Sequence, residues 1–181
     1  MAELIFVITL ALVAQTSALD WAKADRETAR LSPSAFTSLP AAIRGELERR
    51  GCTVPQPFNA RRPGNVVSGR FTSATAADWA ALCSIKQASS ILVFRGGSTS
   101  SVDVLATHPD LNYLQVVGPN QAIGYSRAIG VATAASIRQH NRNDPKIPSP
   151  DHDGITDAFV EKGSTVWYWS SGHWLELSGT D

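Results

Sequence analysis

The stretch STVWYWSSGHWLEL, residues 164–177, decides how the end of the chain folds. Aromatic, branched and aliphatic residues dominate both halves of it, and the pair Ser171-Gly172 stands between them. Two such runs separated by a two-residue turn of this composition are typical of a β-hairpin. We therefore predict two antiparallel strands at 164–170 and 173–177.

This hairpin has two unlike faces, because successive side chains of a strand point to opposite sides of the sheet. The turn pairs Trp169 with Trp174 and Trp167 with Glu176, and all four side chains then share one face. We predict that they form a ligand-binding surface, an aromatic platform for a glycan, a peptide or a partner protein. The alternative is that the leader or the helix expected at 38–50 covers them. A register slip of one residue would reverse the faces.

Strand-like segments precede the hairpin at intervals of about ten residues, which is typical of an antiparallel meander rather than of β-α-β units. They lie at 65–72, 78–84, 89–95, 102–106 and 111–117. The third contains Ile91-Leu92-Val93-Phe94, a continuous apolar run that indicates a strand buried on both faces.

Two segments have the apolar spacing of helices. In 38–50 an apolar residue recurs every fourth position, at Leu39, Ile43 and Leu47. Gly51 follows this segment, at the position where a residue in the left-handed conformation commonly ends a helix. In 126–140 the same spacing relates Ile129, Thr133 and Ile137. We therefore predict an α+β fold: one antiparallel β-meander sheet of about six or seven strands, with one or two packed helices.

The N-terminus predicts export. An apolar run, Leu4 to Ala14, precedes small residues that end at Ala18, which is the pattern of a cleaved signal peptide. The run is too short to cross a bilayer, which takes about 20 residues. We expect a signal peptide at 1–18, a polar leader at 19–37 and a single domain at 38–181, in the periplasm or outside the cell. Glu3, with no basic residue beside it, favours the alternative of an apolar helix packed on the domain.

The chain has two cysteines, Cys52 and Cys83. In an oxidising compartment two such thiols most simply pair with each other, so we predict a disulfide. The alternatives are a catalytic thiol or two metal ligands, but neither cysteine has a histidine or a second cysteine close in sequence.

Composition argues against two classes of partner. The 16 basic and 16 acidic residues cancel, so there is no electrostatic case for binding nucleic acid. No polybasic cluster favours anionic lipid. After residue 18 there is no second apolar run long enough to span a membrane.

Residues 151–157 contain three acidic residues in a short loop: Asp151, Asp153 and Asp157. Carboxylates at this spacing around a glycine suit calcium, a hard cation that prefers oxygen ligands. The stretch resembles the calcium loop of FG-GAP and VCBS β-propeller repeats, in which such a loop precedes an apolar strand. The resemblance covers about ten residues, occurs once, and departs from the pattern at Ser149. The alternative is a simple turn with solvated acids.

Several short sequence segments resemble those of a group of uncharacterised exported bacterial proteins. This resemblance implies export and a shared fold, but it implies no activity. They are Leu39-Pro40, the segments 51–56 and 78–83, and Gly172-His173-Trp174. We expect a small exported binding module that uses the aromatic hairpin face and a cation loop, and we assign no catalytic residue. The alternatives are an exported hydrolase that draws its acid–base pair from His152, Asp153 or Glu176, and a structural protein of the cell envelope.

Overall fold

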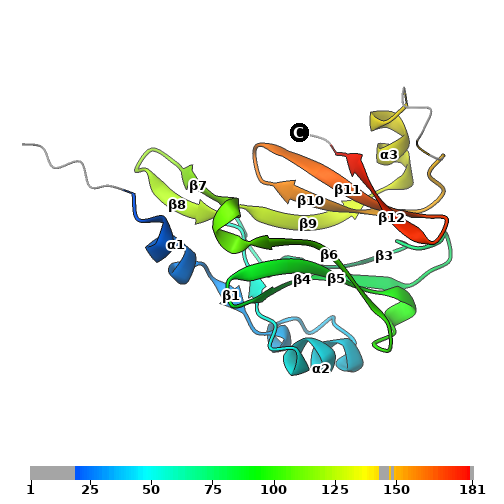
Figure 1. Ribbon diagram of the computed structural model, residues 1–181, viewed down its shortest axis with the longest axis horizontal. Coiled ribbons are helices and arrows are strands. Elements are labelled where there is room, and N and C mark those ends of the chain that lie inside the picture. Colours follow the sequence, from blue (N-terminus) through cyan, green and yellow to red (C-terminus); the bar gives the residue numbers. More distant parts are fainter. Residues whose placement is uncertain (1–18, 143–146, 148, 180–181) are drawn as a thin grey trace, which may run out of the picture.

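The computed structural model describes residues 19–142, 147 and 149–179, so the expected signal peptide at 1–18 lies outside the described residues. Two four-stranded antiparallel sheets lie face to face (Figure 1). The first has the order β3 (Val66–Gly69), β4 (Asp78–Ile85), β5 (Ala88–Phe94), β6 (Val102–Pro109). The second has the order β12 (His173–Ser178), β11 (Gly163–Ser170), β10 (Gly154–Phe159), β9 (Arg127–Ala132).

Shorter elements surround these sheets. Two-stranded pairs are formed by β1 (Arg30–Leu31) with β2 (Val54–Pro55), and by β7 (Leu114–Val117) with β8 (Ala122–Tyr125). The α-helices are α1 (Trp21–Glu27), α2 (Ala41–Arg49) and α3 (Ala134–His140). In the described residues the short 3₁₀ turns are η1 (Pro33–Ala35), η2 (Arg95–Gly97) and η3 (Asp110–Tyr113). No helix in the described part of the chain has the length and apolar content to cross a bilayer.

The predicted single meander of six or seven strands is wrong, although the mixed α+β composition and the antiparallel pairing are confirmed. Burial explains the split into two main sheets. Strands β4 and β5 are buried along nearly their whole length, on both faces. A sheet of this kind needs a covering layer on each side, and here one is a helix and the other is a second sheet.

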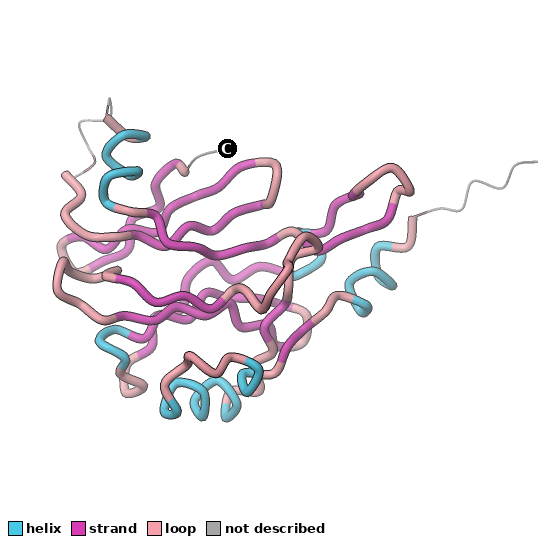
Figure 2. Tube along the Cα trace, turned by 180° about the vertical axis from the view of Figure 1, so that it is seen from behind, coloured by secondary structure: helices cyan, strands magenta, loops and turns pink. Residues whose placement is uncertain are grey.

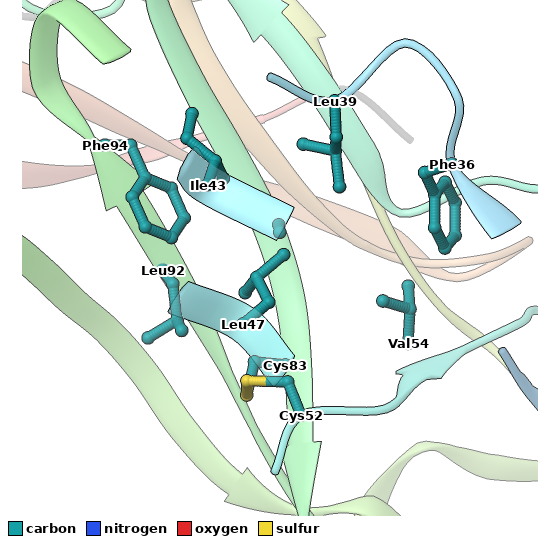
Figure 3. Close-up of a cluster of buried hydrophobic side chains, with 10 residues drawn as sticks. Phe36, Leu39, Ile43, Leu47, Cys52, Val54, Cys83, Leu92 and Phe94 are labelled. Carbon is teal, nitrogen blue, oxygen red and sulfur yellow. A yellow bond between two sulfur atoms is a disulfide. The ribbon is translucent and has the colours of Figure 1, made fainter. Parts of the chain in front are cut away.

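Helix α2 covers the outer face of the first sheet (Figure 3). Ile43 and Leu47 are fully buried in one cluster with Leu92 and Phe94 of β5. Burying an aliphatic side chain of this size stabilises a fold by about 1.5–3 kcal/mol. The apolar stripe predicted for this segment is therefore confirmed as the contact between helix and sheet.

The end of α2 is fixed covalently. Gly51 has a φ of 74°, the left-handed conformation predicted for the residue that ends the helix. The next residue, Cys52, forms a disulfide with Cys83 of β4, and both sulfurs lie within the same cluster (Figure 3). The predicted pairing of the two cysteines is confirmed.

The core between the sheets is built by the opposite faces of the same strands. Ile91 and Val93 of β5 and Ile155 of β10 are completely buried there. The strand expected from the Ile91–Phe94 run is thus buried on both faces, as predicted, with alternate residues in two different cores.

Helix α3 covers part of the outer face of the second sheet, where Ile137 packs with Val166 and Tyr168 of β11. The single helix predicted over 126–140 is wrong in its first half, because residues 127–132 form β9. Thr133 separates the two elements: its side chain accepts a hydrogen bond from the Ser136 amide and caps α3.

One side of the sandwich is closed by Asn65, a buried residue just before β3. Its side-chain amide donates to the Arg127 carbonyl over 3.1 Å and accepts from the Ile129 amide over 2.8 Å. The side chain therefore pairs with β9 as a backbone peptide group of a neighbouring strand would. This contact brings the β3 and β9 edges together.

The predicted register of the C-terminal hairpin is confirmed, with Trp169 opposite Trp174 and Trp167 opposite Glu176. Its aromatic face turns toward the first sheet. The Trp174 indole donates to Asp103 of β6 over 3.0 Å. The covering element is therefore the first sheet, not the helix at 38–50 or the leader.

Residues 19–37, expected as a polar leader, contribute α1, β1 and η1. Helix α1 packs beside β7 and β8, at one end of the sheets (Figure 2). Arg30 forms ion pairs with Asp25 over 2.5 Å and with the fully buried Asp110 over 2.8 Å. Asp110 also accepts a hydrogen bond from Ser84 of β4, so this network ties the segment to the first sheet.

We predict that reducing the disulfide lowers the free energy of unfolding by about 3–4 kcal/mol, because the cross-link closes a long loop in the unfolded chain. Urea unfolding with and without a phosphine reductant measures this difference. The unreduced protein should titrate no thiol, and two reactive thiols would contradict the prediction.

Candidate functional site

A cleft of about 560 Å³ opens between β6 and strands β10–β12, on the side of the sandwich opposite to Asn65. Its position follows from the strand order, because β3 and β9 meet at one side while β6 and β12 border the other. Its lining comes from both sheets, from η3 and from the β10–β11 turn: Ala106, His108, Tyr113, Asp157, Phe159, Lys162, Gly163, Ser164, Thr165, Trp167 and Glu176.

Arg127 lies beneath this cleft and is fully buried. Its Nε and Nη2 atoms donate to the two oxygens of Asp157, over 2.9 and 2.8 Å. Nη1 donates to the carbonyl and the hydroxyl of Ser89, both over 2.9 Å, and Nη2 also donates to the Ala106 carbonyl over 2.7 Å. These contacts use all five donors of the guanidinium.

The charge of Arg127 is fixed. Burial alone would lower the pKa of its guanidinium, but the hydrogen bonds and the negative charge of Asp157 raise it above its ordinary value. One face of the guanidinium lies 4.6 Å from the centre of the Tyr113 ring. Because every donor is satisfied, Arg127 supports the cleft and has none left for a ligand.

Ala106 adopts a left-handed backbone conformation, with a φ of 49°, where β6 departs from its regular register with β5. This conformation costs an alanine on the order of 1–3 kcal/mol and persists where surrounding contacts hold it. Here the hydrogen bond from Arg127 to the Ala106 carbonyl does so. The irregularity lies at the cleft, as strand bulges often do beside functional sites.

Aromatic side chains line the cleft. The Tyr113 ring lies 5.7 Å from the Phe159 ring and 6.0 Å from the His108 imidazole, centre to centre. Trp167 is half-buried, and its buried indole Nε1 has no hydrogen-bond partner among the described residues. The Lys162 ammonium lies over the Phe159 ring at 4.4 Å. The cleft therefore combines aromatic surface with charged groups at its mouth.

The structure divides the four predicted ligand-binding residues into two pairs. Trp167 and Glu176 line the cleft. Trp169 and Trp174 do not: their rings pack edge to face at 5.3 Å. The Arg95 guanidinium lies 4.9 Å from the Trp169 ring. With the Trp174–Asp103 hydrogen bond, this contact ties the two sheets together.

The three predicted calcium ligands have separate partners. Asp157 is paired with Arg127 in the interior, Asp153 approaches Arg70 over 3.4 Å, and the exposed Asp151 accepts from the Tyr168 hydroxyl over 3.2 Å. Within the described residues no three metal-ligating side chains form a group. Calcium binding stays a prediction.

The residues named for hydrolysis are spread over both faces of the second sheet. His152 is buried and stacks on Tyr168 at 4.5 Å, on the face toward α3. Glu176 lies on the opposite face, in the cleft. Asp153 is held by Arg70 and does not line the cleft either. The cleft thus contains one of the three, and hydrolysis stays untested.

Sequence reasoning missed the pairing of Arg127 with Asp157, and it did not assign Tyr113, Phe159 or Lys162 to a site. Arg127, Ile129 and Val131 alternate along β9, and Ile155, Asp157 and Phe159 alternate along β10. Arg127 in β9 and Asp157 in β10 carry opposite charges. Each occupies a position where the alternation predicts an apolar residue. Opposite charges at such positions are the signal that could have indicated the buried pair.

No protein-family model, curated protein or solved structure matches the chain. Its function is therefore inferred from the geometry of the cleft.

We predict that Asp157→Asn lowers the free energy of unfolding by about 3–5 kcal/mol, because it leaves the Arg127 charge buried without compensation. The matched change Asp151→Asn should alter it by less than about 0.5 kcal/mol, since that side chain is 78% exposed. Urea unfolding measures both. Equal losses that appear only in the presence of calcium would instead indicate a shared cation site.

We predict that the folded protein resists tyrosine ionisation at alkaline pH. Burial raises the pKa of all three tyrosines, Tyr113, Tyr125 and Tyr168. A raised pKa contributes stability that is complete below the unfolded value, about 10, and is lost as the pH rises through the folded values.

Absorbance at 295 nm should therefore show little tyrosinate at pH 10 in the native protein and about half ionisation in urea. Coincident titration curves for the two states would contradict the expected shifts.

Proposed function

We propose that the chain is an exported glycan-binding module, and that the cleft between β6 and β10–β12 holds an oligosaccharide. The observation that carries the proposal is the composition of this cleft. The rings of Tyr113, Phe159 and Trp167 share one open cavity with polar side chains from both sheets. Mixed surfaces of this kind bind ligands that are themselves both apolar and polar.

A sugar ring has such a mixed surface. Its C–H bonds form apolar patches that stack on aromatic rings, and its hydroxyls lie around the edge and need hydrogen-bond partners. In the cleft the Glu176 carboxylate can accept from hydroxyls, and the Thr165 hydroxyl and the Lys162 ammonium can donate to them. These polar groups lie beside the aromatic surface, which favours a sugar over a purely apolar ligand.

The base of the cleft supports the same choice. Arg127 and Asp157 neutralise each other, and every donor of Arg127 is used within the protein. A site built for phosphate would offer free guanidinium or backbone donors at its base. Recognition must therefore come from the rings and from the side chains around the mouth.

Export is supported by two observations. The disulfide between Cys52 and Cys83 is consistent with an oxidising compartment. The apolar segment Leu4–Ala14, followed by small residues, has the pattern of a cleaved signal. An exported module with an open cleft would meet glycans of the cell surface or of the medium.

We predict that cellopentaose or chitopentaose changes the tryptophan fluorescence of the protein, and that Trp167→Phe removes at least half of this change. The control is Trp169→Phe, which replaces an indole of the same hairpin outside the cleft and should preserve the change. A fluorescence titration at constant protein concentration measures both variants.

An unchanged signal with these glycans and with an oligogalacturonate, together with unchanged amide spectra, would overturn the proposal. Binding of an extended peptide in their place would assign the cleft to a different class of ligand. Release of new reducing ends during incubation would favour the hydrolase alternative.

A further inference from the structure

We propose that the glycan is acidic, with a carboxylate that faces Lys162 and a sugar ring that stacks near Trp167. This inference rests on the proposed glycan-binding function and specifies its ligand. It depends on the distribution of charge along the cleft, which the hairpin geometry of the second sheet determines.

Lys162 lies in the turn between β10 and β11. Its backbone amide donates to the Phe159 carbonyl over 2.9 Å, which fixes the turn, and its ammonium lies over the Phe159 ring. The side chain is exposed and forms no ion pair within the described chain. One end of the cleft therefore carries a positive charge without an internal counter-ion.

Glu176 marks the other end. It is exposed, lies opposite Trp167 on β12, and likewise forms no ion pair among the described residues. Strand β11 advances roughly 14 Å between Gly163 and Trp167, four residues at about 3.4 Å each. This spacing between backbone positions exceeds the screening length of about 8 Å at physiological ionic strength. Lys162 and Glu176 therefore occupy different positions along the cleft and are not paired with each other within the described chain.

The segment between these ends is electrically neutral, because Asp157 is compensated by Arg127. A ligand that spans the cleft thus meets a cation, a neutral aromatic stretch and a carboxylate in turn. The ligand that fits this order has an anionic group at the Lys162 end and hydroxyls at the Glu176 end. A span of roughly 14 Å suits an oligomer of linked sugars better than a single ring.

The test compares one acidic and one neutral oligomer, pentagalacturonate and cellopentaose, by fluorescence titration of the full chain. We expect Lys162→Gln to weaken pentagalacturonate binding about fivefold more than cellopentaose binding, because only the acidic oligomer loses a screened charge contact as well as a hydroxyl contact. Lys162→Arg should retain the acidic preference, and raising the salt concentration should diminish it.

The control is Lys86→Gln. Lys86 is an exposed lysine in the turn between β4 and β5, and it does not line the cleft. The Lys86→Gln variant should bind pentagalacturonate and cellopentaose with the same affinities as the wild type. Equal affinity of the wild type for the two oligomers, or an equal loss for both in Lys162→Gln, would overturn the inference while the glycan-binding function stands. Failure of every oligomer to bind would overturn the function itself.

Discussion

Arg127 places a guanidinium in the interior of the molecule, between the two main sheets. It projects from β9 in the second sheet, pairs with Asp157 of β10, and reaches Ser89 and Ala106 in the first sheet. A charge in this position is tolerable only when its hydrogen bonds are complete, because an uncompensated ion in the interior costs several kcal/mol. One side chain thus links the two sheets and holds the conformation of the strand beside the cleft.

The two sides of the sandwich are consequently unlike. At one side Asn65 joins β3 to β9 with hydrogen bonds of backbone type. At the other side β6 and β12 meet at one end, through Asp103 and Trp174, and diverge to form the cleft. The asymmetry places the rings of Tyr113, Phe159 and Trp167 where solvent can reach them. The candidate site is therefore a result of how the sheets close rather than of one loop.

Sequence patterns over a few residues correctly predicted the elements whose geometry depends on neighbouring residues alone. The hairpin register follows from Ser171-Gly172, and the cap of α2 follows from Gly51. The division into two sheets could not be predicted in this way, because it depends on which distant surfaces cover β4 and β5. β9 was missed because Ile129 and Ile137 have helical spacing, although Thr133 ends one element and begins the other. Of the candidate site, Trp167 and Glu176 were predicted from alternation, whereas the Arg127–Asp157 pair required knowledge of the partner strand.

The disulfide and the cleft belong to different layers of the molecule. Cys83 points from β4 toward α2, whereas the cleft is built on the far side of that sheet. Chemical reduction would therefore loosen the helical cover first, and the cleft would keep its shape for as long as the inter-sheet core holds. In a compartment whose redox state varies, such a protein would lose its covalent reinforcement and still keep the cleft.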